Sequence, residues 1–254
     1  MSGLDKLAGR VIAGDARAIA RAISLVEDET DEGKALLGEM SARGRHAYRI
    51  GVTGPPGAGK STLVDRLAAA LRSPERSRGA ATVGILAVDP SSPFSGGAVL
   101  GDRVRMQSHS ADEGVFIRSM ATRGHLGGLA RATADAATVL DAAGKDYVII
   151  ETVGVGQAEV DIVRAADVTI VVLVPGAGDE VQALKAGIME IANIFVVNKA
   201  DREGADRVVS GIESYLSLES KGVRPVIVKT VATTGEGVPE LVDAIDTFRA
   251  QAKT

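Results

Sequence analysis

The sequence contains no cysteine, which excludes disulfides and every metal site that depends on thiolate ligands. Aromatic residues make up only 3% of the 254 residues, so platforms for stacking nucleic-acid bases are not expected. A net charge of −4 supplies no basic field for nucleic acid either. The longest apolar run, VTIVVLV at 168–174, is too short to cross a bilayer. These absences favour a cytoplasmic protein that binds neither membrane nor nucleic acid.

Apolar spacing along the chain predicts two parts. Residues 1–47 carry apolar residues at helical spacing and are expected to form an N-terminal helical extension. Over residues 48–254, short β-branched runs alternate with amphipathic helical segments. This alternation is typical of an α/β domain with a mostly parallel, doubly wound sheet flanked by helices. Strands are expected at 48–53, 82–89, 115–120, 147–152, 167–174, 193–199 and 224–231.

The segment GPPGAGKS at 54–61 matches the phosphate-binding pattern G-x-x-x-x-G-K-[ST], between an expected strand and an expected helix. Glycines in such a loop let backbone N–H groups converge on phosphate oxygens. The side chain of Lys60 would reach the β- and γ-phosphates, and the hydroxyl of Ser61 would bind Mg²⁺. The chain is therefore expected to have a P-loop NTPase fold. The residues predicted to surround the phosphates are Gly54, Pro56, Gly57, Ala58, Gly59, Lys60, Ser61 and Thr62.

The segment VVNKAD ends a later strand and contains the pattern N-K-x-D, formed by Asn198, Lys199 and Asp201. A carboxylate at Asp201 can accept hydrogen bonds from N1–H and the N2 amino group of guanine, whereas adenine offers neither. The stem of Lys199 can lie along the base, and Asn198 can tie loops together. Alone, this segment could be an ordinary polar turn, but its position after a P-loop favours guanine.

A second segment, VATTGEG at 231–237, follows the last expected strand. The backbone of Val231, Ala232 and Thr233 could contact the base, and a group near Ala232 could read the O6 atom of guanine. An ordinary loop is the alternative. With Asp201, this segment favours GTP and GDP as the bound nucleotides.

Three acidic residues that could surround Mg²⁺ lie at the end of an expected strand or in the loop that follows one. Glu151 opens the string ETVG, in which Gly154 would contact the γ-phosphate. Asp89 and Asp102 are the other candidates, although each could instead cap a turn or a helix. Because Mg²⁺ is held by few carboxylates together with phosphate and water, Ser61 with some of these three acids would suffice.

Hydrolysis is expected to be slow without a partner. Val155 occupies the position after Gly154 where familiar small GTPases have a water-orienting glutamine, and Gln157 is a weaker substitute. A Gly-rich loop at 175–178 precedes a helical segment, in which Gln182 and Lys185 share one face. These two side chains could swing toward the nucleotide when a partner docks, or could be part of a solvated helix face.

Six strings resemble the MeaB/ArgK-like GTPases, a family of SIMIBI-class P-loop GTPases: GPPGAGKST, AVDPSSPFSGGAVLGDRVRM, SMATRGHLGGLARAT, ETVGVGQAEVDI, GAGDEVQALKAGIMEI and VVNKAD. The resemblance implies a chaperone of an adenosylcobalamin-dependent acyl-CoA mutase that gates cofactor loading and helps to eject damaged cobalamin. Methylmalonyl-CoA mutase is the default partner, with isobutyryl-CoA and hydroxyisobutyryl-CoA mutases as alternatives. It also implies that Asp179, Gln182 and Lys185 belong to a switch that couples the mutase to hydrolysis.

Two other activities share this kind of loop. A nickel-type metal-delivery GTPase would need clustered cysteine and histidine ligands, and the three histidines of this sequence are scattered. A transport-associated ATPase or kinase is disfavoured by Asp201. Members of the resembling family usually continue into a C-terminal helical arm that forms a dimer. This sequence ends at Thr254, so a homodimer is expected only if another interface replaces the arm.

Overall fold

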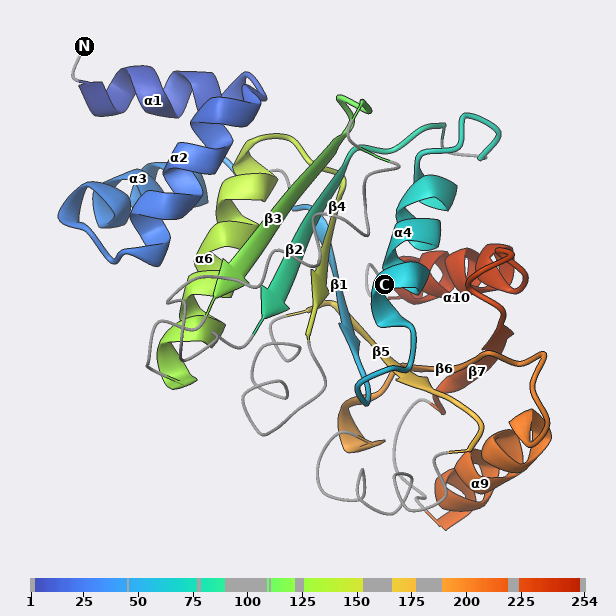
Figure 1. Ribbon diagram of the computed structural model, residues 1–254. Helices are drawn as coiled ribbons and strands as arrows, with labels where there is room; N and C mark the ends of the chain where they lie inside the picture. Colours follow the sequence, from blue (N-terminus) through green and yellow to red (C-terminus); the bar gives the residue numbers. More distant parts are fainter. Residues whose placement is uncertain are drawn as a thin grey trace. The chain divides into compact units, whose positions relative to one another are not determined.

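The computed structural model describes residues 3–44, 46–76, 79–89, 109, 111–121, 126–152, 166–176, 189–218 and 224–251. Seven strands form a sheet in the order β3-β2-β4-β1-β5-β6-β7 (Figure 1). The pairs β2/β3, β1/β5, β5/β6 and β6/β7 are parallel. The predicted fold class, a mostly parallel sheet with flanking helices, is confirmed.

All seven strands lie where the apolar runs predicted them. They are β1 (Tyr48–Thr53), β2 (Val83–Asp89), β3 (Val115–Ala121), β4 (Tyr147–Glu151), β5 (Val168–Leu173), β6 (Ile194–Asn198) and β7 (Val226–Thr230). The described helices are α1 (Gly3–Ile12), α2 (Ala16–Glu27), α3 (Asp31–Ser41), α4 (Lys60–Leu71), α6 (Leu126–Ala142), α9 (Ala205–Leu218), α10 (Val238–Gln251) and the short 3₁₀ helix η2 (Met189–Ile191).

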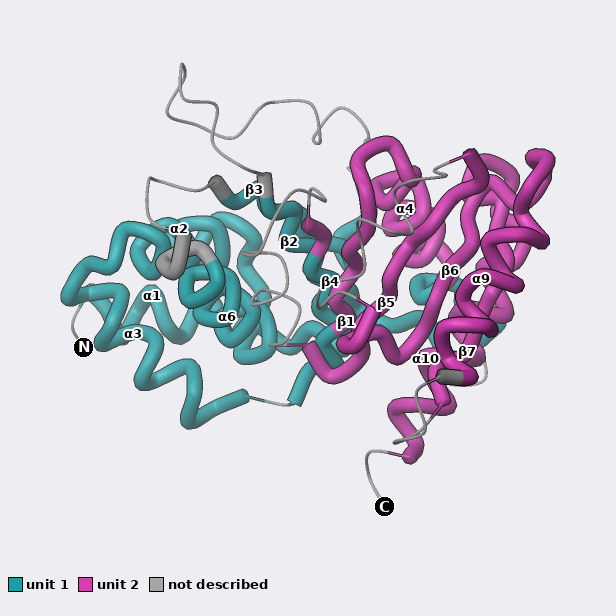
Figure 2. Tube along the Cα trace, turned by 90° about the horizontal axis from the view of Figure 1, so that it is seen from below, with its two compact units in different colours: residues 1–49, 71–150 teal, residues 50–70, 151–254 magenta. Residues whose placement is uncertain are grey.

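The chain divides into two compact units, which Figure 2 colours separately. Unit 1 comprises residues 1–49 and 71–150, and unit 2 comprises residues 50–70 and 151–254. The N-terminal helices therefore share unit 1 with β2, β3 and α6. The division into an extension at 1–47 and a GTPase domain at 48–254 stays a prediction.

In unit 1, the N-terminal helices α1, α2 and α3 pack against α6. Helix α2 follows Asp15, whose Oδ1 accepts a hydrogen bond from the N–H of Ala18 at 2.9 Å. Helix α3 begins in the same way, with Thr30 Oγ1 accepting from the N–H of Gly33 at 2.9 Å. The apolar face of α2 is buried because its residues recur at helical spacing. This face consists of Ala18, Ile19, Ala22, Ile23 and Val26.

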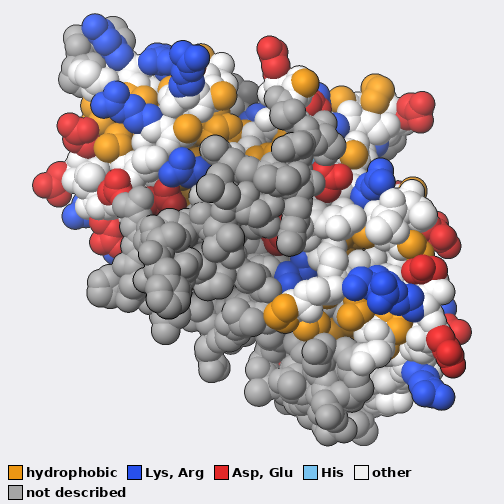
Figure 3. Space-filling view, viewed as in Figure 1, with side chains coloured by type: hydrophobic (Ala, Val, Ile, Leu, Met, Phe, Trp, Pro, Cys, Tyr) orange, Lys and Arg blue, Asp and Glu red, His pale blue; other side chains and the backbone are white. Residues whose placement is uncertain are grey.

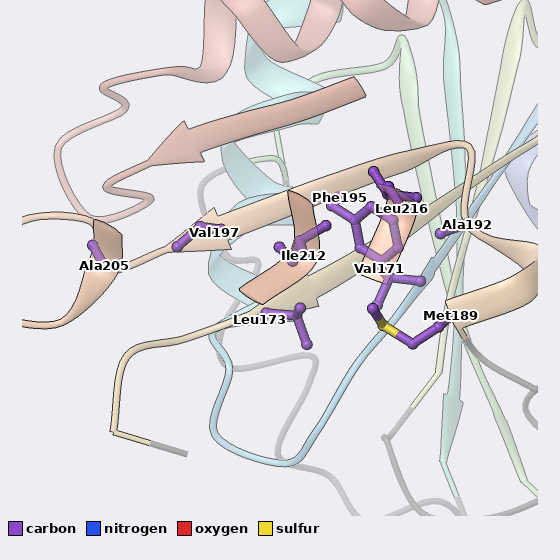
Figure 4. Packing of buried hydrophobic residues seen from close by; sticks show 9 residues of the cluster. All are labelled: Val171, Leu173, Met189, Ala192, Phe195, Val197, Ala205, Ile212 and Leu216. Carbon is purple, nitrogen blue, oxygen red and sulfur yellow. The ribbon is translucent and has the colours of Figure 1, made fainter. Parts of the chain in front are cut away.

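In unit 2, strands β5 and β6 are buried along their whole length. Apart from Thr169 and Asn198, the residues of both strands are apolar, as expected for parallel strands covered on both sides. Buried hydrophobic side chains of this unit form the cluster shown in Figure 4. In it, Phe195 and Val171 lie close to Leu216 and Ile212 from α9. This packing fixes the carboxyl ends of β5 and β6, where the candidate site begins.

One ion pair of unit 1 makes stability depend on pH. Arg72 follows α4 and donates from Nε and Nη2 to the two carboxylate oxygens of Asp112, each at 2.8 Å. The side chains are 24% and 31% exposed, so solvent screens the pair only in part. The hydrogen bonds from Arg72 are the main reason why the pKa of Asp112 lies below its ordinary value.

Asp112→Asn is expected to lower the free energy of unfolding at neutral pH by about 1–2 kcal/mol, because it removes a charge-assisted pair. A lowered folded-state pKa means that the Asp112 carboxylate stabilises the fold above its unfolded pKa of about 3.9. This contribution is lost as the pH falls through the folded-state pKa. The variant should therefore lose less stability than wild type between neutral pH and about pH 3. Urea unfolding at both pH values measures this difference, with the exposed Asp31→Asn as control. An equal loss of unfolding free energy in Asp112→Asn and wild type would show that the Asp112 carboxylate does not cause the pH dependence.

Candidate nucleotide-binding site

The phosphate loop joins β1 to α4 within unit 2, and its glycines are required by close backbone approaches. Gly54 has φ +140°, and a Cβ atom there would lie 2.2 Å from the carbonyl oxygen of Val172. Gly59 has φ +86°, and a Cβ atom there would lie 2.5 Å from Nδ2 of Asn198. A side chain at either position would push the loop away from β5 or β6.

Lys60 is the first residue of α4 and is only 6% exposed. Its Nζ donates to the carbonyl oxygens of Gly54 and Pro55 at 2.8 and 3.0 Å. The ammonium group is therefore held over the loop to which it belongs, next to the positive end of the α4 dipole. Such an arrangement favours an anion such as phosphate.

Ser61 and Glu151 place a hydroxyl and a carboxylate side by side next to this loop. The hydroxyl of Ser61 donates to Oε1 of Glu151 at 2.5 Å, and Glu151 is 5% exposed at the end of β4. A hydroxyl and a carboxylate in contact next to a phosphate loop fit the preference of Mg²⁺ for a few hard oxygen donors. These two residues would hold the ion, directly or through water.

Two buried threonines fix the position of Glu151 and were not predicted from the sequence. The N–H of Thr152 donates to the carbonyl oxygen of Val52 at 3.0 Å. Its hydroxyl donates to the hydroxyl of Thr53 at 3.0 Å. The end of β4 is thereby fastened to the end of β1, where the phosphate loop starts. The only sequence signal for this pair was two threonines at neighbouring strand ends.

Asn198, at the end of β6, connects three of the predicted segments. Its Nδ2 donates to the carbonyl oxygen of Ala58 in the phosphate loop at 2.8 Å. Its Oδ1 accepts from the hydroxyl of Thr230 at 3.1 Å and from the N–H of Ala232 at 3.0 Å. Because Asn198 is 2% exposed, these bonds compete little with water. The segment at 231–233 is therefore positioned relative to the phosphate loop through one amide group.

Lys199 and Asp201 follow Asn198 at the mouth of the site. Lys199 has φ +56°, and its Nζ donates to the carbonyl oxygen of Gly57 at 2.7 Å, so its stem runs toward the phosphate loop. Asp201 is exposed, and its carboxylate makes no hydrogen bond with any residue that the structure describes. The residue is thus accessible to a ligand. The backbone between Lys199 and Asp201 is tied down, because the N–H of Ala200 donates to the carbonyl oxygen of Thr230 at 3.0 Å.

The other predicted residues divide into those that the structure places and those that it does not describe. Pro56, Thr62 and Thr233 are exposed on the phosphate loop, α4 and the loop after β7, whereas Val231 is buried. The backbone of Asp89 ends β2 in unit 1, but its side chain is not described. The residues outside the described ranges are Asp102, Gly154, Val155, Gln157, Asp179, Gln182 and Lys185.

Two other kinds of site, a cluster of metal-binding side chains and a membrane-spanning helix, are absent from the described residues. On the face drawn in Figure 3, basic and acidic side chains are interspersed over the described surface. Among the residues in the described ranges, no group of three or more histidine, aspartate or glutamate side chains could hold a metal ion. None of the described helices is both long enough and apolar enough to cross a membrane.

Comparison with known proteins identifies related chains. A family model described as methylmalonyl Co-A mutase-associated GTPase MeaB matches residues 19–254. A Pyrococcus abyssi protein named as a GTPase is 54% identical over 251 residues, covering 97% of this chain and 76% of the relative. The GTPase ArgK of Escherichia coli is 35% identical over 250 residues, covering 94% and 74%. The mitochondrial methylmalonic aciduria type A homolog of Mus musculus is 35% identical over 268 residues, covering 98% and 63%.

Solved structures support the same fold. A LAO/AO transport system kinase matches with a TM-score of 0.77 and 28% identity, covering 98% of this chain and 76% of the other. The hydrogenase maturation factor HypB of Archaeoglobus fulgidus matches with a TM-score of 0.57, covering 91% and 98%. At 20% identity, this second likeness shows the fold alone.

Proposed function

The chain belongs to the MeaB family of methylmalonyl Co-A mutase-associated GTPases, and we propose that it controls a cytoplasmic adenosylcobalamin-dependent acyl-CoA mutase. As a family member it is a GTPase, which converts GTP and water to GDP and phosphate. The proposal is that Mg²⁺-dependent hydrolysis is coupled to cofactor loading or to release of damaged cofactor. Methylmalonyl-CoA mutase is the first candidate partner, since the family description names it.

The observation that carries the nucleotide part of the proposal is the connection of Asn198 to the phosphate loop and to Ala232. It supports a site in which one nucleotide meets both segments, with its phosphates at Lys60 and its base at Asp201. Lys60 would exchange its two carbonyl acceptors for phosphate oxygens. Bound Mg²⁺ would neutralise charge on the β- and γ-phosphates, and Ser61 and Glu151 would hold it there.

Slow hydrolysis without a partner is the second part of the proposal. It rests on Val155, which cannot orient a water molecule in the place of a glutamine. We infer that the mutase brings the segment with Asp179, Gln182 and Lys185 toward the γ-phosphate. This inference is supported by the match of these residues to the switch motif of the MeaB/ArgK-like GTPases. The three residues lie outside the described part of the chain, so their geometry carries none of this inference.

Nucleotide-dependent binding of the mutase tests the coupling. If binding of the mutase favours the GTP-bound conformation, GTP must favour binding of the mutase by the same factor. The affinity of the chain for methylmalonyl-CoA mutase should therefore differ by at least ~5-fold between GDP and a non-hydrolysable GTP analogue. Isobutyryl-CoA and hydroxyisobutyryl-CoA mutases are titrated in parallel, with an adenine nucleotide analogue as control. The same affinity in every nucleotide state, or binding to none of the three mutases, would contradict the proposal.

A further inference from the structure

The loop after β7 is closed by hydrogen bonds between its own residues. The N–H of Val231 donates to the carbonyl oxygen of Glu236 at 3.0 Å. The carbonyl oxygen of Val231 accepts from both the N–H and the hydroxyl of Thr234, at 3.0 and 3.1 Å. These bonds close the turn, but they leave the carbonyl oxygens of Ala232 and Thr233 outside it. Of the three residues predicted to contact the base, Ala232 and Thr233 therefore have carbonyl oxygens that the turn itself does not hold.

Arg66 of α4 binds these two carbonyl oxygens. Its Nε donates to the carbonyl oxygen of Ala232 at 3.2 Å, and its Nη2 donates to the carbonyl oxygen of Thr233 at 2.8 Å. Because a guanidinium group is planar, two donors on two consecutive carbonyls fix both the position and the direction of the backbone. Arg66 makes no ion pair with a carboxylate of any described residue, so these carbonyls are its binding partners there.

The contact also affects the donors of the loop. The carbonyl of Ala232 and the N–H of Thr233 belong to one peptide group, so a cation on the carbonyl strengthens that N–H as a donor. Within the described part of the chain, the Thr233 N–H makes no hydrogen bond. Guanine presents an acceptor at O6, whereas adenine presents an amino donor at the same position. A polarised N–H at this place thus favours guanine.

Helix α4 connects this contact to the phosphate loop. Lys60 and Arg66 are six residues apart on the same helix, which corresponds to a rise of about 9 Å. Lys60 is held over the phosphate loop, and Arg66 holds residues 232–233 in the loop after β7. Because both side chains belong to one rigid helix, α4 sets the distance between the segment that would hold the phosphates and the segment that would contact the base.

We propose that Arg66 is a positioning residue for guanine recognition, which holds residues 232–233 so that a backbone N–H meets O6. The inference rests on the proposed nucleotide site and adds a residue that lies outside its motifs. In the sequence, Arg66 is only a basic residue on an amphipathic helix, so no local pattern pointed to it.

Nucleotide affinities of Arg66→Met test this inference. The variant keeps an apolar stem and loses both donors. Its affinity for GDP should fall about tenfold, which corresponds to ~1.4 kcal/mol. The affinity for 2-aminopurine riboside diphosphate, which lacks O6, should change less than about twofold, since there is no acceptor to misplace. The affinity of Arg66→Lys for GDP should lie between those of wild type and Arg66→Met, because one ammonium group does not reproduce the two fixed donors of a guanidinium group. The exposed Arg207→Met on α9 is the matched control and should bind both nucleotides like wild type.

Three outcomes would overturn the inference, and they differ from one another. Unchanged affinity of Arg66→Met for GDP would show that the contact does not position the loop. Equal losses for GDP and the analogue would show a general structural role. If wild type itself bound GDP no better than ADP, the guanine site would be wrong, and the role of Arg66 with it.

Discussion

Asp201→Asn is expected to weaken GTP binding by about 10²- to 10⁴-fold while leaving the fold intact. Two hydrogen bonds from the guanine N1–H and N2 amino group to a carboxylate contribute roughly 1.5–3 kcal/mol each. The variant replaces one acceptor oxygen by an amide donor, which opposes the N2 amino group. Asp201 is exposed and makes no hydrogen bond within the described residues, so the free energy of unfolding should stay within about 0.5 kcal/mol of wild type.

The same substitution should raise the affinity for xanthosine triphosphate. Xanthine has a carbonyl oxygen at C2, which accepts from the asparagine amide and is repelled by the native carboxylate. Competition titrations with GTP and xanthosine triphosphate measure the exchange of preference. Asp243→Asn on α10, an exposed position, is the control and should keep the wild-type preference. If Asp201→Asn kept its preference for GTP over xanthosine triphosphate, Asp201 would not be the group that reads the base.

Lys60→Met should reduce the rate of GTP hydrolysis by about 10²- to 10³-fold, the usual effect of removing one donor that stabilises transition-state charge. Lys60 is buried and held by two carbonyl oxygens, so its ammonium group is oriented before phosphate arrives. Methionine keeps the length and removes the charge. Single-turnover hydrolysis at saturating GTP separates this effect from weaker nucleotide binding.

Lys34→Met on α3 is the control for Lys60→Met, because its side chain is 61% exposed and lies in unit 1. It should hydrolyse GTP at the wild-type rate. A thermal unfolding curve shows whether Lys60→Met is folded. A folded Lys60→Met protein with wild-type turnover would mean that the loop at 54–61 does not carry the hydrolysis.

The strands could be predicted from the sequence because each is a short apolar run bounded by turn residues. Strand β6 was expected at 193–199 and spans Ile194–Asn198. The prediction for the last strand was too long at its start: it included Pro225, but β7 begins at Val226. Proline has no N–H to donate to a neighbouring strand, so pairing starts after it.

The candidate site was predictable where a motif has a fixed spacing. Asn198 lies against the phosphate loop even though 140 residues separate it from Ala58, because both follow parallel strands that end at one edge. Arg66 was missed because its partners, 166 and 167 residues away, are backbone carbonyls, and a carbonyl leaves no trace in a sequence. The roles of Asp89, Asp102 and Lys185 stay predictions.

GTP turnover with and without methylmalonyl-CoA mutase tests whether the mutase triggers hydrolysis. We expect slow hydrolysis by the chain alone and an acceleration of at least about tenfold when the mutase is added, because the partner completes a site that lacks a water-orienting glutamine. Lys60→Met should show no such acceleration. Turnover of several molecules of GTP per second by the isolated chain, or an unchanged rate with all three candidate mutases, would contradict a GTPase that a mutase activates.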